Sequence, residues 1–143
     1  MVIAVDFDGT IVTHEYPNIG KEIPFAIDTL KRLQQSPDNL IVLWTVREGA
    51  ELEEAVKYCR DRGLEFYAVN KNYPEESAEH PEPRKLKADL FIDDRNLGGL
   101  PEWGIIYRTI MSRKYFEPIT NEIMPEYQLP KKKGFFKSFF GLF

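Results

Sequence analysis

Short apolar runs separated by helix-like segments are the feature that most limits how this chain can fold. Because the apolar character within each run is continuous rather than alternating, we expect strands that are covered on both faces, which is typical of a parallel sheet between helices. The five runs are residues 2–7 (VIAVDF), 40–45 (LIVLWT), 65–69 (EFYAV), 88–93 (ADLFID) and 104–110 (GIIYRTI).

Two of the intervening segments have helical spacing. Residues 24–35 start with Pro24, a residue suited to the first turn of a helix, and carry one apolar stripe. Residues 48–63 repeat the stripe and end at Gly63. The polar stretch 70–87 contains three prolines and predicts a surface loop or a short irregular lid. The order strand, helix, strand, helix, strand, loop, strand, strand predicts an α/β fold.

The charge is divided unevenly along the chain. The net charge is −4, yet residues 127–143 contain four lysines and no acid, so residues 1–126 are the acidic part. We therefore expect a domain over 1–126 and a basic, aromatic tail over 127–143. This balance gives no overall attraction to nucleic acid. A single cysteine, Cys59, excludes an internal disulfide framework, and no run reaches the ~18 apolar residues of a membrane span, so we expect a cytoplasmic protein.

Charged and hydroxyl side chains follow the ends of three predicted strands. Ligands of open α/β sheets bind outside the carboxyl ends of the strands, so these side chains are expected at one edge. Carboxylates this close repel one another unless a cation lies among them. Oxygen ligands without cysteine or paired histidine favour Mg²⁺ over zinc. The residues are Asp6, Asp8, Thr45, Arg47, Asp93 and Asp94.

The second strand adds groups that suit a phosphate. The Thr45 hydroxyl can donate to a phosphate oxygen, and a helix that starts near Glu48 directs free backbone N–H groups to the same place. Arg47 either binds the substrate phosphate or pairs with a surface acid, and the sequence leaves both open. Together these residues predict a phosphate site beside a metal.

Four short motifs then resemble the haloacid dehalogenase (HAD) superfamily of phosphohydrolases. They are DFDGT at 6–10, an apolar strand that ends in Thr45, a lysine at 85 or 87, and IDD at 92–94, within residues 1–110. The resemblance implies a Rossmann-like three-layer sandwich with the first strand central. It also implies a tight turn after DFD and a small flap over residues 10–24.

The resemblance further implies hydrolysis of a phosphomonoester through an aspartyl-phosphate. Asp6 would be the nucleophile and Asp8 the general acid and base. Such chemistry independently needs two carboxylates, one to attack phosphorus and one to carry the proton. A turn after Phe7 can place Asp8 beside the leaving group.

The resemblance also implies which residues bind the phosphate and the metal ion. Thr45 would bind phosphate, and Lys85 would neutralise both nucleophile and phosphate, with Lys87 as the alternative lysine. The Mg²⁺ set would comprise Asp6, Asp8 through its backbone carbonyl, Asp93, and Asp94 through the metal's water or by orienting the lysine.

The family's large cap domain has no counterpart in the sequence, because the two gaps where it is inserted are short. An open site suits a bulky substrate or a partner subunit that covers it. Two other functions remain open: a non-catalytic phosphate-binding or scaffold protein with this fold, and a phosphatase of nucleic-acid ends, which the acidic body disfavours.

The tail supports three interpretations. On a helix, the phenylalanines within 131–143 would share one face behind a run of lysines, as in segments that bind a membrane surface. The same face could pack on the acidic body or on a second subunit in a homo-oligomer. Gly134 and Gly141 weaken a short helix, which leaves disorder as the third interpretation.

Overall fold

The computed structural model describes residues 1–77 and 84–117. The chain forms two compact units, Met1–Tyr107 and Arg108–Phe143, which are considered separately. The predicted tail, and the predicted boundary between 126 and 127, lie outside the described residues.

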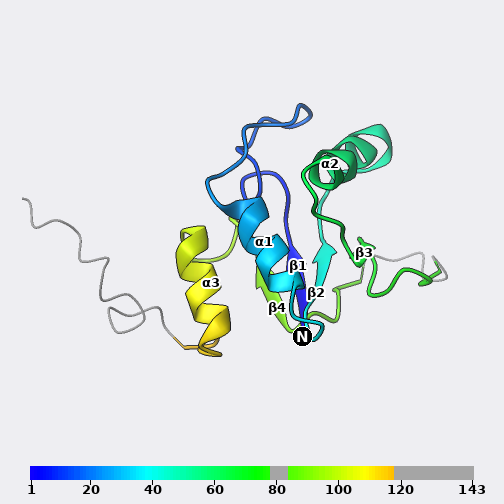
Figure 1. Cartoon of the computed structure of the whole chain (residues 1–143). Helices are drawn as coiled ribbons and strands as arrows, with labels where there is room; N and C mark the ends of the chain where they lie inside the picture. The colour runs from blue at the N-terminus through cyan, green and yellow to red at the C-terminus, as the bar shows by residue number, and fades with distance from the viewer. Residues whose placement is uncertain (78–83, 118–143) are drawn as a thin grey trace, which may run out of the picture. The chain divides into compact units, whose positions relative to one another are not determined.

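In its described part, the first unit is built on a four-stranded parallel sheet (Figure 1). The strand order is β3-β2-β1-β4, so β1 is internal and its Val5 pairs with Leu43 on one side and Ile92 on the other. The carboxyl ends of β1, β2 and β4 are therefore adjacent. The strands are β1 (Val2–Val5), β2 (Leu40–Leu43), β3 (Ala68–Val69) and β4 (Leu90–Ile92).

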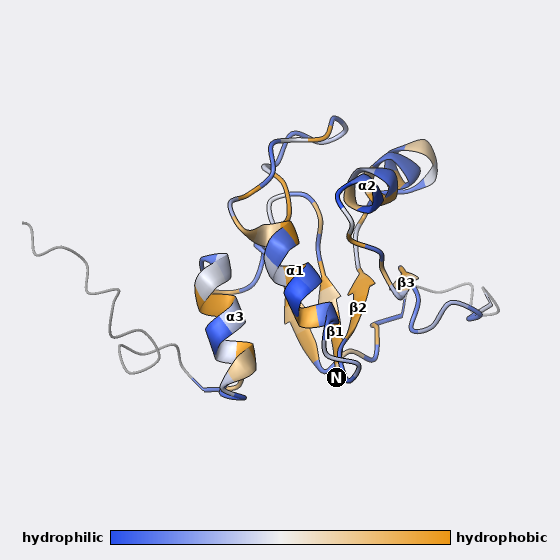
Figure 2. Cartoon of the chain, viewed as in Figure 1, coloured by the Kyte–Doolittle hydropathy of each residue, from blue (hydrophilic) through white to orange (hydrophobic). Residues whose placement is uncertain are grey.

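Among the residues that the structure describes, three helices accompany the sheet, which confirms the predicted Rossmann-like α/β sandwich. They are α1 (Ala26–Gln34), α2 (Gly49–Asp61) and α3 (Trp103–Met111). The apolar stripe of α1 is buried and α1 contacts β2, while its polar residues face away from the sheet (Figure 2). No helix in the described ranges is long and apolar enough to cross a bilayer.

The prediction of a strand over 104–110 is wrong, because this run forms most of α3. Trp103, Ile106 and Ile110 are buried and stand at i, i+3 and i+7, which is the spacing of one helical face. The N–H groups of Ile105 and Ile106 donate to the carbonyl of Glu102, which starts the helix. A short apolar run contains too little periodicity to distinguish a buried strand from a buried helix.

The loop predicted at 70–87 contains neither helix nor strand in its described parts and is organised by Asn72. Asn72 donates through its backbone N–H and its side-chain amide to the Glu76 carboxylate, and its Oδ1 accepts the N–H of Lys87. Arg84 pairs with Glu76 at 3.1 Å. This brings Leu86 onto one face of the sheet, where it packs with Ala4, Val42 and Ala68.

Candidate metal and phosphate site

A tight turn follows β1 and starts the flap. The Phe7 carbonyl accepts hydrogen bonds from the N–H groups of Thr10, Ile11 and Val12 at 2.9–3.2 Å. Val12 then bridges to Asp8 in parallel and to Glu22 in antiparallel fashion. The chain therefore turns back at its second aspartate, as the sequence predicts, and the flap returns to the same end of β1.

Three of the predicted carboxylates come together at the ends of β1 and β4. One oxygen atom each of Asp6, Asp93 and Asp94 lies within 4.8 Å of the others. The N–H of Asp6 donates to the carbonyl of Ile92 at 3.0 Å, which fixes the two strand ends side by side. All three carboxylates are partly buried, and their donor set suits a hard divalent cation. The Asp8 carboxylate is not in this cluster.

Thr10 and Gly9 support the cluster, and neither was singled out from the sequence. The Thr10 hydroxyl oxygen lies 3.4 Å from Asp6 Oδ2 and accepts the N–H of Asp94 at 3.0 Å. Trp103 Nε1 donates to the Thr10 carbonyl at 3.1 Å. Gly9 has φ +84°, and a Cβ there would lie 2.3 Å from Asp94 Oδ2. The sequence signal that could have identified them is the motif DFDGT, of which Gly9 and Thr10 are the last two residues.

The cluster strongly disfavours ionisation of Asp6. Burial, together with the nearby charges of Asp93 and Asp94, raises the pKa of Asp6 from 3.8 to about 7, and a hydrogen bond from the backbone at Phe7 opposes this. Within the described ranges, the cation at ion-pair distance is Arg95, whose Nε lies 3.8 Å from Asp94 Oδ2 with 77% of its side chain exposed. Sequence reasoning gave Arg95 no role.

Asp8 pairs with Arg47, which corrects the expected pairing of that arginine with a surface acid. Arg47 Nε donates to Asp8 Oδ2 and Nη2 donates to Oδ1, both at 2.7 Å. The arginine is 0% exposed and the aspartate 6% exposed. The hydrogen bond with Asp8 is the main reason that the pKa of Arg47 is raised. The acid that pairs with Arg47 is therefore buried and not on the surface, and binding of a substrate phosphate by Arg47 stays a prediction.

Thr45 lies just beyond β2 and is held by Asn70. Its N–H donates to Asn70 Oδ1 at 2.9 Å, and its hydroxyl oxygen accepts the N–H of Arg47 at 3.2 Å, which leaves the hydroxyl proton available to an acceptor. Asn70 follows β3 with φ 53°, a conformation that asparagine tolerates better than most residues. Helix α2 follows Glu48 without a side-chain cap on its first N–H groups.

The structure does not bring either candidate lysine to the cluster. Lys85 and Lys87 are both exposed, and neither forms an ion pair within residues 1–77 and 84–117. Lys85 Nζ lies 5.3 Å from the centre of the Phe91 ring. The choice between the two lysines stays a prediction.

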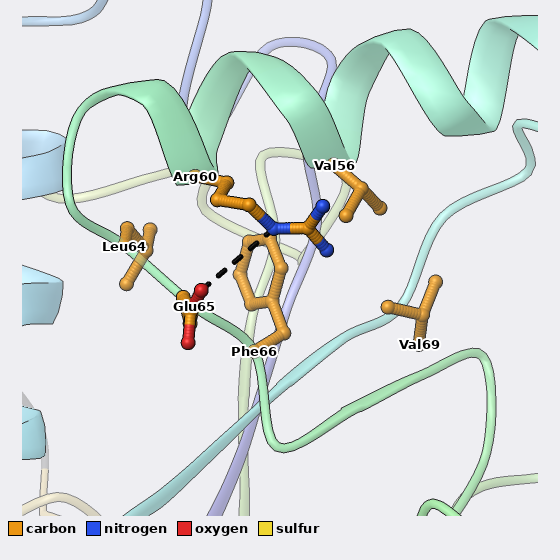
Figure 3. A pocket seen from close by; sticks show the side chains of 6 residues that line it. All are labelled: Val56, Arg60, Leu64, Glu65, Phe66 and Val69. Carbon is orange, nitrogen blue, oxygen red and sulfur yellow. Dashed lines mark ion pairs between the residues drawn. The ribbon is translucent and has the colours of Figure 1, made fainter.

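A separate cavity of about 200 Å³ lies between α2 and the segment leading into β3 (Figure 3). Its side chains are mainly apolar, and the Arg60–Glu65 ion pair at 3.7 Å crosses it. None of the predicted site residues lines it. The lining residues are Val56, Arg60, Leu64, Glu65, Phe66 and Val69.

Comparison with known proteins gives a likeness to a solved structure. No protein-family model and no curated protein matches the chain. A solved structure of a conserved protein from Bacteroides thetaiotaomicron is 65% identical with a TM-score of 0.75, over 81% of this chain and 93% of the other. At this identity and coverage the chain belongs to the same family as that conserved Bacteroides thetaiotaomicron protein.

Proposed function

We propose that this protein is a Mg²⁺-dependent phosphomonoester hydrolase of the HAD type that acts through an aspartyl-phosphate. The observation that carries the proposal is the separation of the two acids of DFD. Asp6 lies with Asp93 and Asp94, whereas Asp8, two residues on, is paired with Arg47. Carboxylates placed in different environments suit different tasks in one reaction.

In the proposed reaction an Asp6 carboxylate oxygen attacks phosphorus and forms an acyl-phosphate while the bond from phosphorus to the ester oxygen breaks. The leaving oxygen takes the proton of the Asp8 carboxyl in its acid form and departs as the alcohol, which leaves Asp8 as the carboxylate that pairs with Arg47. A water then attacks the same phosphorus and gives a proton to Asp8. The phosphorus–oxygen bond to Asp6 breaks, which releases inorganic phosphate and restores both carboxyl groups.

The proposed Mg²⁺ ligands are the carboxylates of Asp6, Asp93 and Asp94 with the backbone carbonyl of Asp8. Oxygen atoms are the ligands that this ion prefers. The short distances among the three carboxylates support the assignment, since acids within 4.8 Å of one another repel unless a cation lies between them. When bound, Mg²⁺ supplies positive charge that offsets repulsion between the nucleophile and an anionic phosphate.

Substrate binding is proposed to use the Thr45 hydroxyl and a positively charged side chain that moves toward the phosphate. The Thr45 hydroxyl oxygen accepts the N–H of Arg47, so the hydroxyl proton can be donated to a phosphate oxygen, while Asn70 holds the Thr45 backbone N–H. Lys85 is proposed to reach the phosphate on substrate binding, and the exposed Arg95 beside Asp94 is a second candidate. The approach of either side chain would offset the negative charges of Asp6 and of the phosphate.

The proposed substrate is a phosphorylated small molecule or a larger phosphoester rather than nucleic acid, because the first 126 residues are acidic. The cytoplasm is the proposed compartment, since Cys59 is a buried free thiol. The tail at 127–143 is proposed to contact either a membrane surface or a second copy of the chain.

Steady-state hydrolysis of para-nitrophenyl phosphate, with Mg²⁺ or with chelator, tests the activity. We expect turnover only with Mg²⁺, and its complete loss in Asp6→Asn. Asp28→Asn, on the exposed surface of α1, is the matched control and should retain activity. Phosphate binding without turnover in the wild type would instead identify a non-catalytic phosphate-binding protein. A panel of phosphorylated metabolites then addresses substrate identity.

The metal assignment has its own test. Asp93→Asn removes a carboxylate ligand, whereas Asp8→Asn leaves the backbone carbonyl in place, so Mg²⁺ affinity should fall much further in Asp93→Asn. Titration calorimetry with Mg²⁺ measures the difference. Equal losses of affinity in the two variants would contradict the proposed ligand set.

A further inference from the structure

We propose that Arg47 is a positioning residue that couples the tip of the flap, residues 16–18, to the orientation of Asp8. The coupling is read from contacts alone. Its consequence for catalysis rests on the proposed function, in which Asp8 carries the proton.

The guanidinium of Arg47 uses all five of its N–H groups. Two donate to the Asp8 carboxylate at 2.7 Å. Two of the remaining contacts are with the flap, Nη1 to the carbonyl of Pro17 at 3.0 Å and Nη2 to the carbonyl of Asn18 at 2.9 Å. Nη1 also lies 3.3 Å from the carbonyl of Glu51 in α2. One side chain therefore joins the turn after β1, the flap and a helix.

Two aromatic rings lie close to the guanidinium of Arg47. The centre of the Phe7 ring lies 5.1 Å from Arg47 Cζ, and that of the Tyr16 ring lies 5.2 Å from it. Phe7 belongs to the buried turn, whereas Tyr16 belongs to the flap and is 49% exposed. Displacing the flap tip would remove one ring and two carbonyl acceptors from a buried charge, so the tip and the arginine must move together.

Different contacts hold the base of the flap. The Thr13 N–H donates to the Lys21 carbonyl at 2.7 Å, and the Ile23 N–H donates to the Ile11 carbonyl at 2.8 Å. Backbone pairs close the base and Arg47 holds the tip, so we expect the pairs at the base to open more often once the tip is released. If the tip opens, Arg47 is released, and the Asp8 carboxylate loses the two hydrogen bonds that fix its orientation. The order of the flap and the orientation of Asp8 therefore change together.

Lysine cannot replace this arginine. Lys retains the charge but offers three donors from one atom, so it cannot hold two carboxylate oxygens and two flap carbonyls at once. Arg47→Lys therefore tests geometry rather than charge. Tyr16→Ala is a milder variant, because an exposed ring is removed without burying a new group.

The first measurement is backbone hydrogen exchange in the full chain, which requires no activity. In Arg47→Lys and in Asp8→Asn, we expect exchange at Thr13 and Lys21 to accelerate about tenfold or more, while Thr29 in α1 keeps its protection. Tyr16→Ala should shift the flap amides in the same direction by less. Arg62→Lys is the matched control, because Arg62 also stacks on a ring, that of Tyr58 at 3.4 Å, and should leave the flap unchanged.

The second measurement is hydrolysis of aryl phosphates with good and poor leaving groups. Arg47→Lys should lower kcat with KM nearly unchanged, and the loss should be about tenfold greater for phenyl phosphate than for nitrophenyl phosphate, since only the poorer leaving group depends on a proton from Asp8. Adding Arg47→Lys to Asp8→Asn should cost no further activity.

The outcomes separate the two ideas. Unchanged flap exchange in both Arg47→Lys and Tyr16→Ala, or acceleration that includes Thr29 equally, would overturn the coupling. A raised KM with kcat retained would make Arg47 a phosphate ligand and would also overturn it. Faster flap exchange in a protein that hydrolyses neither ester would leave the coupling intact and remove the proposed function.

Discussion

Replacing Asp6 with Asn should stabilise the metal-free protein at alkaline pH while it removes the nucleophile. The substitution keeps the size of the side chain and removes its charge from a partly buried site beside Asp93 and Asp94. Burial raises the pKa of Asp6 in the folded protein from its ordinary 3.8 to about 7, so between these two pH values the folded protein binds a proton that the unfolded chain does not. Stability therefore falls as pH rises from about 4 to about 7.

The size of this effect follows from the pKa. A shift of this size corresponds to at most about 4 kcal/mol, and screening by solvent at a partly exposed site reduces it to about 2 kcal/mol. Asp6→Asn should recover most of this at pH 8, which is roughly 6 °C in Tm for a chain of this length. At pH 5 the folded aspartate is already protonated, so the gain should fall to less than half.

Thermal unfolding in chelator at pH 5 and pH 8 measures both gains, and Asp28→Asn controls for loss of surface charge. Mg²⁺ should then stabilise the wild type more than Asp6→Asn, because it binds the folded ionised cluster. An Asn variant that is less stable than the wild type at pH 8, or equally stabilised at both pH values, would refute the electrostatic account of the cluster.

Three further predictions concern Gly9, Asn70 and Cys59. Gly9→Ala forces a Cβ to 2.3 Å from Asp94 Oδ2 at φ +84°, so the free energy of unfolding should fall by about 2 kcal/mol or more and Mg²⁺ affinity should drop; unchanged chemical denaturation would contradict the packing. Asn70→Ala leaves the Thr45 N–H without its acceptor and should raise KM for an aryl phosphate several-fold, whereas unchanged kinetics would show that Thr45 is positioned otherwise. Burial raises the pKa of Cys59 to about 12, so a thiol reagent at pH 8 should label native protein far more slowly than protein in denaturant, and fast native labelling would contradict that burial.

The cluster of Asp6, Asp93 and Asp94 could be predicted because it depends on two simple rules. Apolar runs end at these residues, and parallel strands bring their carboxyl ends to one edge. The structure adds that β1 and β4 are neighbours, with Val5 paired to Ile92, which places the acids next to each other. No local pattern determines which strands are neighbours.

The pairing of Asp8 with Arg47 could not be predicted in the same way. The two residues are 39 positions apart, and their contact depends on how far the turn after Phe7 rotates Asp8 away from Asp6. It also depends on the flap returning to cover the arginine, since carbonyls of 17 and 18 complete its hydrogen bonds. Such a site is determined by tertiary packing rather than by sequence spacing.

The run at 104–110 shows a different limit. Seven residues with several apolar and β-branched members satisfy the pattern of a buried strand, and the helical stripe becomes clear only when Trp103 is included at the start. Trp103 also donates to the carbonyl of Thr10, so this helix supports the turn that carries the candidate site.

The most direct test of the central claim is to trap the phosphorylated enzyme. Asp8→Asn should form the acyl-phosphate and hydrolyse it slowly, so acid quenching after mixing with nitrophenyl phosphate and Mg²⁺, followed by peptide mass spectrometry, measures the intermediate. The account predicts one phosphoryl group on the peptide that contains Asp6, absent when Asp6→Asn is added and absent without Mg²⁺. Turnover by the wild type with no phosphorylated peptide in Asp8→Asn, together with retained activity in Asp6→Asn, would contradict it.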